Sequence, residues 1–281
     1  ALALEAELDM DVVEEFGRMY VQTPQVARVN PAAKWDMEDF YQAGGIPRVM
    51  GMLRPLLDLS VVTCTGKTLG ENLEEYRFQY PENREIIRPL ENPFSPKGGV
   101  AVLRGTLAPR TGVTKPGAFD PSLYHFQGRA RVFDGEEAAD QAILAGEIRP
   151  GDVLVIRYEG PRGGPGMREM YKAMKLLYGM GLGRSTAVVT DGRFSGTNNG
   201  CFVGHISPEA AEGGPIALVE DGDEILIDVN EGRLDLLVSP EELERRRAVW
   251  TPPARPEVPQ GWLRLYAAAA TSADRGAVLE F

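Results

Sequence analysis

The pattern of apolar and polar positions divides the chain into a helical first part and a strand-rich second part. Residues 9–16 combine a capping residue with apolar positions at helical spacing, and residues 35–41 and 46–57 show the same period. A Gly-Gly pair separates the last two stretches, as expected at the end of a helix. We therefore expect residues 1 to about 90 to be mainly helical.

A proline-rich polar segment follows and marks a change of character. Four prolines occur between residues 81 and 96, and short apolar runs then predict strands at residues 100–105, 153–158 and 186–190. We place a domain boundary here, with one domain at residues 1–92 and the second at residues 93–281.

The second part also contains a hairpin signal. Residues 225–229 and 233–238 are apolar runs that flank Asn230-Glu231-Gly232, a three-residue turn with glycine at its last position. Such a hairpin interrupts the alternation of strand and helix that a doubly wound parallel sheet requires. We expect an α+β fold, in which a mainly helical segment precedes a β-rich C-terminal barrel-like domain with covering helices. The expected helix starts in this domain are Asp134, Ser207 and Ser239.

Composition and charge exclude several classes of protein. Of the 281 residues, 43% are hydrophobic and 25% are charged, which excludes a disordered chain. The net charge of -11 argues against binding to nucleic acid, and no apolar run approaches the length of a membrane span. The first residues lack both an initiator Met and the basic region of a signal peptide, so we expect a processed or excised chain in the cytoplasm.

The two cysteines, Cys64 and Cys201, are too few for a disulfide framework or a four-thiolate metal site. They match no metal-binding spacing. We therefore expect each to be a small, buried apolar residue in a reducing compartment.

Candidate chemistry begins in a loop after the strand at 153–158. Residues 158–167 contain four glycines and two prolines, a composition that suits either a tight structural turn or a close approach of backbone N–H groups to a ligand. A helix is expected from Met167 to about Tyr178, and its Met170, Met174 and Leu177 share one face that is typical of a core.

Glu169 lies in the first turn of that expected helix, and two interpretations stay open. A carboxylate there complements the helix dipole. It is also suited to ligating a hard cation beside the glycine-rich loop.

A second polar loop, residues 190–200, contains Ser195. The nucleophile pattern Gly-x-Ser-x-Gly is absent because Arg193 occupies its first position, and the chain has only two histidines, His125 and His205. A serine hydrolase with His205 as partner is therefore the least favoured reading.

Several long motifs occur in the order found in one known family. The chain resembles the dihydroxy-acid dehydratase and sugar-acid dehydratase family from about residue 5 to about residue 250. The motifs are residues 44–47, 65–72, 157–170, 190–196, 204–210 and 213–217.

The resemblance is to the C-terminal half of the family's members, and it implies that a preceding domain of those proteins has no counterpart in this sequence. Family members carry a preceding domain with three cysteine ligands of an iron–sulfur cluster and most magnesium ligands, among them a carbamylated lysine. Neither Cys64 nor Cys201 matches a cluster ligand. The resemblance thus implies a fragment or separate half, with residues 1–92 as the tail of the cluster domain, that domain as its partner, and a homo-oligomer.

Two residues carry roles over from the family. Glu169, in Gly-Pro-Gly-Met-x-Glu-Met, matches a Mg2+ ligand, and Ser195, in Gly-Arg-Phe-Ser-Gly, matches the presumed base, acting as its alkoxide. A serine hydroxyl needs nearby cations to ionise. The reaction that the resemblance implies is loss of water from a 2,3-dihydroxy carboxylate. In it, the cluster iron acts as Lewis acid on the 3-hydroxyl and Ser195 removes the proton at carbon 2. The resulting enol then tautomerises to a 2-keto acid.

The substrate branch is less sharply indicated. Phe194 fits dihydroxy-acid and aldonate dehydratases, whereas residues 171–175 and 197–199 depart from the pattern of many branched-chain enzymes and slightly favour a sugar acid or an unassigned substrate over 2,3-dihydroxy-isovalerate. The alternative function is a catalytically inert, swivelling barrel that only binds its partner domain.

Overall fold

A computed structural model describes residues 1–164, 166–194, 196, 199–253 and 261–280. The chain forms two compact units. One, the helical unit, is residues 18–99, and the other, the barrel unit, combines residues 1–17 with 100–281. The division of the chain after residue 92 stays a prediction.

The helical unit is built from short helices around a small core. Its elements are the last part of α2 (Val12–Gln22), from Arg18 onward, and then α3 (Met37–Gln42), α4 (Gly45–Met52), the 3-10 turn η1 (Arg54–Leu56) and α5 (Leu69–Glu75). Asp36 and Thr68 cap α3 and α5, each in a reciprocal capping box. The buried core is Phe40, Ala43, Ile86 and Ile87. The helices predicted at 9–16, 35–41 and 46–57 are confirmed, the last one split by Leu53 into α4 and η1.

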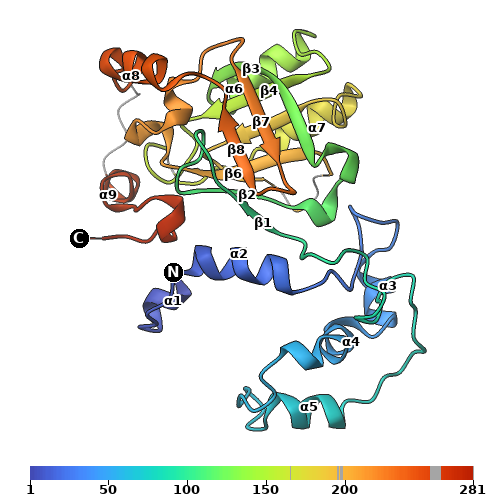
Figure 1. The fold of residues 1–281 in the computed structure, drawn as a ribbon. Coiled ribbons are helices and arrows are strands. Elements are labelled where there is room, and N and C mark those ends of the chain that lie inside the picture. Colours follow the sequence, from blue (N-terminus) through green and yellow to red (C-terminus); the bar gives the residue numbers. More distant parts are fainter. Residues whose placement is uncertain (165, 195, 197–198, 254–260, 281) are drawn as a thin grey trace. The chain divides into compact units, whose positions relative to one another are not determined.

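The barrel unit contains one sheet of eight strands, in the order β1-β2-β6-β5-β4-β3-β7-β8 (Figure 1). The strands are β1 (Ala101–Leu103), β2 (Thr111–Thr114), β3 (His125–Asp134), β4 (Asp152–Arg157), β5 (Ala187–Thr190), β6 (Cys201–Ser207), β7 (Glu224–Asp228) and β8 (Arg233–Leu236). The N–H of Arg104 donates to the Gly232 carbonyl at 2.9 Å, and the N–H of Leu234 donates to the Arg104 carbonyl at 3.0 Å. These bonds join the two ends of the sheet into a nearly closed barrel, which confirms the predicted α+β, barrel-like class.

Strand directions are mixed. Strands β3, β4, β5 and β6 run parallel to one another, whereas β1, β2, β7 and β8 pair antiparallel with their neighbours. The hairpin predicted between residues 225 and 238 is confirmed as β7 and β8, with Gly232 at the left-handed φ of +67°. The pattern did not predict β2, β3 or β6, three strands of the barrel.

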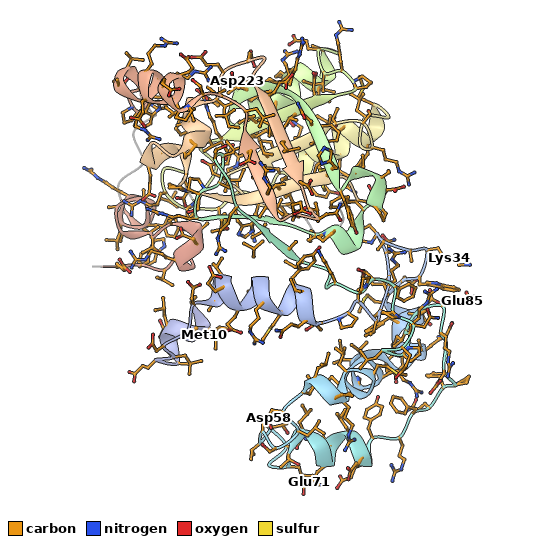
Figure 2. All side chains as sticks on the ribbon, viewed as in Figure 1. Met10, Lys34, Asp58, Glu71, Glu85 and Asp223 are labelled. Carbon is orange, nitrogen blue, oxygen red and sulfur yellow. The ribbon has the colours of Figure 1, made fainter. Side chains whose placement is uncertain are left out.

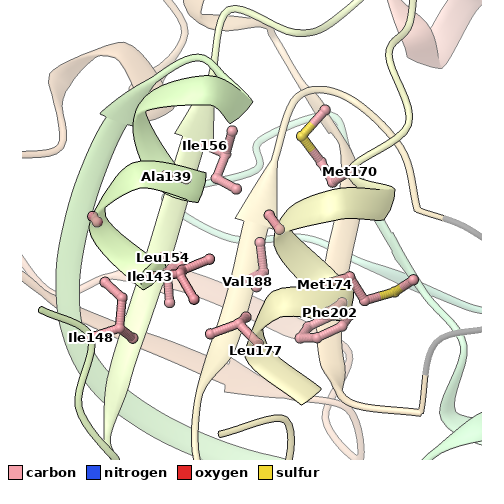
Figure 3. Packing of buried hydrophobic residues seen from close by; sticks show 12 residues of the cluster. Ala139, Ile143, Ile148, Leu154, Ile156, Met170, Met174, Leu177, Val188 and Phe202 are labelled. Carbon is pink, nitrogen blue, oxygen red and sulfur yellow. The ribbon is translucent and has the colours of Figure 1, made fainter. Parts of the chain in front are cut away.

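Helices α6 (Glu136–Leu144) and α7 (Tyr171–Gly179) connect β3 to β4 and β4 to β5, and they cover one face of these strands (Figure 3). Met170, Met174 and Leu177 are at most 1% exposed, so the predicted core stripe is confirmed. The cluster also contains Ala139, Ala142, Ile143, Ile148, Leu154, Ile156, Ala173, Val188 and Phe202. Strand β4 is buried on both faces, as is typical of a parallel strand.

Several local predictions require correction. Helix α7 begins at Tyr171, so Glu169 precedes the helix and does not lie in its first turn. Asp134 ends β3, and the start of α6 is capped instead by Glu159, whose carboxylate accepts the Glu136 N–H at 2.7 Å. Ser207 ends β6, and the short turn η4 (Ala210–Glu212) begins after it. Ser239, by contrast, caps α8 (Pro240–Val249) as predicted.

The cysteines differ from each other. Cys201 is buried, as expected, but Cys64 is exposed, so the expectation of two buried cysteines is wrong for Cys64. Its neighbours Val61 and Val62 are also exposed, because the short loop before α5 contributes nothing to the core of the helical unit.

The remaining elements are α1 (Leu2–Glu5), α9 (Trp262–Ala269), η2 (Pro116–Ala118), η3 (Pro121–Leu123), η5 (Pro215–Leu218) and η6 (Ala273–Arg275). Within the part of the chain that the structure describes, we find no helix with the length and apolar character needed to cross a membrane.

Candidate active site

Two loops leave the same edge of the barrel sheet. Strands β4 and β5 are parallel neighbours, with Ile156 paired opposite Thr190. The glycine-rich loop follows β4 and the loop that contains Ser195 follows β5, so both begin at carboxyl-terminal strand ends. In parallel sheets this edge is the usual place for a ligand.

Backbone hydrogen bonds hold these two loops in register. The N–H of Arg193 donates to the Arg168 carbonyl at 3.0 Å, and the N–H of Met170 donates to the Arg193 carbonyl at 2.8 Å. Together they form a parallel bridge between Glu169 and Arg193. The predicted Mg2+ ligand is thus brought beside the loop that continues to Ser195, which itself lies outside the described residues.

A buried carboxylate, Asp191, anchors the start of both loops. It is fully buried and accepts the backbone N–H groups of Tyr158 at 3.0 Å, Glu159 at 2.8 Å and Ala210 at 3.0 Å. Gly160 packs against it so closely that a Cβ atom there would lie 2.9 Å from the Asp191 carbonyl oxygen. Gly160 therefore supports the interpretation of the glycine-rich loop as a tight structural turn, because only glycine fits at this position without displacement of the backbone.

Two further buried carboxylates extend this arrangement to the helices. Glu159 caps α6, as described above, and Glu136 accepts the N–H groups of Lys172 at 3.0 Å and Ala173 at 3.1 Å at the start of α7. Burial raises the pKa of both Glu136 and Glu159, whereas these hydrogen bonds and the charge of Arg168 act in the opposite direction. Sequence reasoning missed both residues, because each carboxylate binds donors far away along the chain.

The side chain of Glu169 is in a different environment. It is exposed, and among the described residues no hydrogen bond or ion pair engages its carboxylate. Lys115, just after β2, is half-buried, and burial lowers its pKa while the charge of Glu169 opposes that shift. Glu169 and Lys115 therefore lie close enough to interact electrostatically.

His205 joins the same group of side chains. Burial lowers its pKa, and the positive charges of Arg193 and Lys115 lower it further, so the neutral imidazole is favoured near pH 7. The region thus combines an available carboxylate, two cations and a neutral imidazole. Lys115 carried no sequence signal of its own, because its place at the end of β2 comes only from sheet pairing.

The donor set fits magnesium in part. Mg2+ takes oxygen ligands, keeps several waters and is held in many enzymes by one or two carboxylates, so the exposed Glu169 suits it. Among the residues that the structure describes, no three His, Cys, Asp or Glu side chains form a metal-binding group. This part of the chain therefore offers a single carboxylate and not a complete metal site.

The cysteines do not fit an iron–sulfur cluster. Such a cluster is held mainly by several thiolates. The chain has only Cys64 and Cys201, and burial raises the pKa of the Cys201 thiol to about 12, which keeps it protonated.

Comparison with known proteins establishes the family. Residues 85–277 match the model described as "Dihydroxy-acid/6-phosphogluconate dehydratase C-terminal", and residues 1–72 match the corresponding N-terminal model. The chain belongs to the dihydroxy-acid/6-phosphogluconate dehydratase family, which confirms the resemblance seen in the sequence.

Curated relatives with the name dihydroxy-acid dehydratase are similar along the whole chain. The protein of Ignicoccus hospitalis is 51% identical over 283 residues, which cover 100% of this chain and 50% of the relative. The protein of Lachnoclostridium phytofermentans is 50% identical over 282 residues, with the same two shares. The chain therefore spans about half the length of the curated relatives it matches.

Proposed function

We propose that this chain is the C-terminal half of a hydro-lyase that removes water from a 2,3-dihydroxy carboxylate to give a 2-keto acid. The observation that carries the proposal is the backbone bridge between Glu169 and Arg193. In a member of a dehydratase family, this bridge brings an available carboxylate beside the loop that continues to Ser195.

In the proposed reaction, Ser195 takes the proton from carbon 2 of the substrate. The electrons of the broken C–H bond form the double bond to carbon 3, and the C–O bond breaks with its electrons on the leaving 3-hydroxyl. That oxygen takes up one proton and is released as water, which balances the proton removed from carbon 2, and the resulting enol tautomerises to the keto acid. A serine accepts a proton at neutral pH only where positive charge favours its alkoxide. Lys115 and Arg193, whose charges act on His205 at this edge, would supply such charge, and Mg2+ held by Glu169 would add to it.

The cofactors are part of the proposal. Glu169 would provide one Mg2+ ligand, and the other ligands, together with an iron–sulfur cluster, would belong to an N-terminal cluster domain for which residues 1–92 form the tail. Because Cys64 and Cys201 do not fit a cluster, no step is assigned to one on this chain. We further propose a cytoplasmic homo-oligomer, by analogy with the family.

The substrate is proposed at the level of its class. The relatives' shared name, dihydroxy-acid dehydratase, favours a dihydroxy acid, for which 2,3-dihydroxy-isovalerate is our candidate, whereas the departures at residues 171–175 and 197–199 favour a sugar acid. Both are 2,3-dihydroxy carboxylates, so one reaction serves either.

The test uses the full-length product of the locus, reconstituted anaerobically with iron, sulfide and magnesium. Dehydration of aldonates and of 2,3-dihydroxy-isovalerate is measured for the wild type and for Ser195→Ala, with Ser185→Ala as control because the Ser185 hydroxyl donates to the Leu182 carbonyl before β5. We expect Ser195→Ala to lose about 100-fold or more of the turnover, the usual contribution of a general base, and Ser185→Ala to keep it.

Two results would overturn parts of the proposal. Undiminished turnover by Ser195→Ala would exclude Ser195 as the base. A cluster-loaded full-length protein that converts no substrate in the panel would favour the alternative, a barrel that only binds its partner domain.

A further inference from the structure

We propose that Arg168 is a positioning residue that holds Glu169 in the orientation needed to bind Mg2+. It would do so by tying the segment before α7 to the carboxylates at the start of α6. The inference rests on the proposed function, in which Glu169 is a Mg2+ ligand.

The guanidinium of Arg168 reaches three carboxylates. It forms a bidentate pair with Glu137, with Nη2 2.8 Å from Oε1 and Nη1 3.2 Å from Oε2. Nη1 also lies 3.4 Å from Oε1 of Glu159, and Nη2 lies 3.7 Å from Oε2 of Glu136. The side chains of Glu136 and Glu159 are only 8% and 4% exposed, so the arginine connects to the interior and not merely to the surface.

The backbone of Arg168 is fixed on both sides as well. Its N–H donates to the Glu159 carbonyl at 3.1 Å, and its carbonyl accepts the Arg193 N–H at 3.0 Å. Gly192 packs directly on it, since a Cβ there would lie 2.9 Å from the Arg168 carbonyl oxygen. Residue 168 therefore joins the loop after β4 to the loop after β5.

These contacts determine which way Glu169 points. In a segment bridged like a strand, successive side chains point to opposite sides. With the Arg168 side chain held against the start of α6, the next side chain must point away, and Glu169 is indeed exposed. Loss of the arginine contacts would free this segment to rotate and would leave buried carboxylates without their cation.

Arginine is required here for its shape as well as its charge. Its planar fork makes two parallel bonds to Glu137 and still reaches Glu159. A lysine ammonium is a point charge on a flexible stem and cannot hold both carboxylates in this geometry. Arg168→Lys consequently keeps the charge and removes the tie.

The test measures metal binding and not activity. Mn2+, a stand-in for Mg2+ that is visible by EPR, is titrated into the full-length protein, and Mg2+ competition identifies the shared site. The proteins are the wild type, Glu169→Gln, Arg168→Lys and Arg168→Gln. Arg131→Lys is the matched control, because Arg131 pairs only with Glu147, at 3.5 Å, among the described residues.

We expect both Arg168 variants to bind Mn2+ about 10- to 100-fold more weakly, the usual effect of losing a residue that orients a metal ligand. Arg131→Lys should bind as the wild type does. Wild-type affinity in a folded Arg168→Lys protein would overturn the positioning role. Wild-type affinity in Glu169→Gln would instead overturn the proposed role of Glu169 itself, so the two failures are distinguishable.

A second variant protects the test against loss of folding. Glu137 is 71% exposed, so Glu137→Gln removes the bidentate partner without disturbing the core. We expect weaker Mn2+ binding in this variant as well, and unchanged affinity would overturn the proposal even if the Arg168 variants do not fold.

Discussion

In both units, side-chain oxygens accept backbone N–H groups at the starts of helices and loops, but the two units differ in how far apart along the chain the partners lie. In the helical unit, Asp36 and Thr68 cap helices by accepting N–H groups two or three residues further along the chain. At the site edge of the barrel unit, Asp191 and Glu159 accept N–H groups that lie 19 to 33 residues away. The first kind of cap stabilises one helix, whereas the second connects separate loops into one site.

The two kinds of cap also differ in burial. Asp191 is fully buried, and Glu136 and Glu159 are nearly so. In the helical unit, by contrast, the cap Asp36 is exposed to water and the cap Thr68 is partly exposed, and Asp58 and Glu71 are exposed as well (Figure 2). When an exposed acceptor is lost, water replaces it. When a buried acceptor is lost, its donors stay unsatisfied. The site edge should therefore be the more sensitive region.

The largest difference is expected between Asp191→Ala and Asp36→Ala. Asp191→Ala leaves three N–H groups without their acceptor, those of Glu159 and Ala210 buried and that of Tyr158 part-buried, so we expect the free energy of unfolding to fall by about 3 kcal/mol, at about 1 kcal/mol each. Asp36→Ala removes an exposed cap, worth about 1 kcal/mol. Urea unfolding of both variants measures this, and equal losses would contradict the comparison.

One carboxylate in each unit should make stability respond to pH with opposite signs, Glu209 in the barrel unit and Glu71 in the helical unit. Burial raises the pKa of Glu209, which accepts hydrogen bonds from Ser272 and Ala273, so the folded state binds its proton more tightly and loses stability as pH rises above 4.5. In the helical unit, hydrogen bonds from Thr68 lower the pKa of Glu71, which therefore contributes stability above 4.5 and loses it as pH falls.

This contrast is measured with two substitutions and a pH series. Glu209→Gln should gain stability relative to the wild type as pH increases from about 4.5 to 7. Its amide can keep both contacts, because the Ser272 hydroxyl can turn to donate to Ser207. Glu71→Gln should instead be less stable than the wild type at pH 7 and converge with it in acid. A shared direction in the two melting series would argue against the proposed contrast.

The smallest effect on the protein is expected from thiol labelling, which reports how accessible each cysteine is without changing the fold. Cys64, in the helical unit, should react with a thiol reagent in the native protein, whereas Cys201 should react only on unfolding, since it is buried and its pKa is raised to about 12. Loss of the fast reaction in Cys64→Ser identifies the residue. Rapid reaction that persists in that variant would show that Cys201 is accessible.

Much of this protein could be predicted from the sequence where the cause is local. The turn at Gly232 defined the hairpin, Ser239 capped its helix, and Met170, Met174 and Leu177 formed the core stripe. Turns, caps and helical periods depend on residues a few positions apart, so the pattern of the chain contains them. The motifs around Glu169 and Ser195 likewise indicated the family.

Only the tertiary structure decided the features that depend on distant partners. Strand β3 is polar at many positions and exists because it pairs with β4 and β7, and Lys115 reaches the site only through the pairing of β2 with β6. Glu159 replaced Asp134 as the cap of α6, because in the folded chain its carboxylate lies at that helix start. The position of Glu169 therefore depends on hydrogen bonds between loops, and a local sequence pattern cannot predict such bonds.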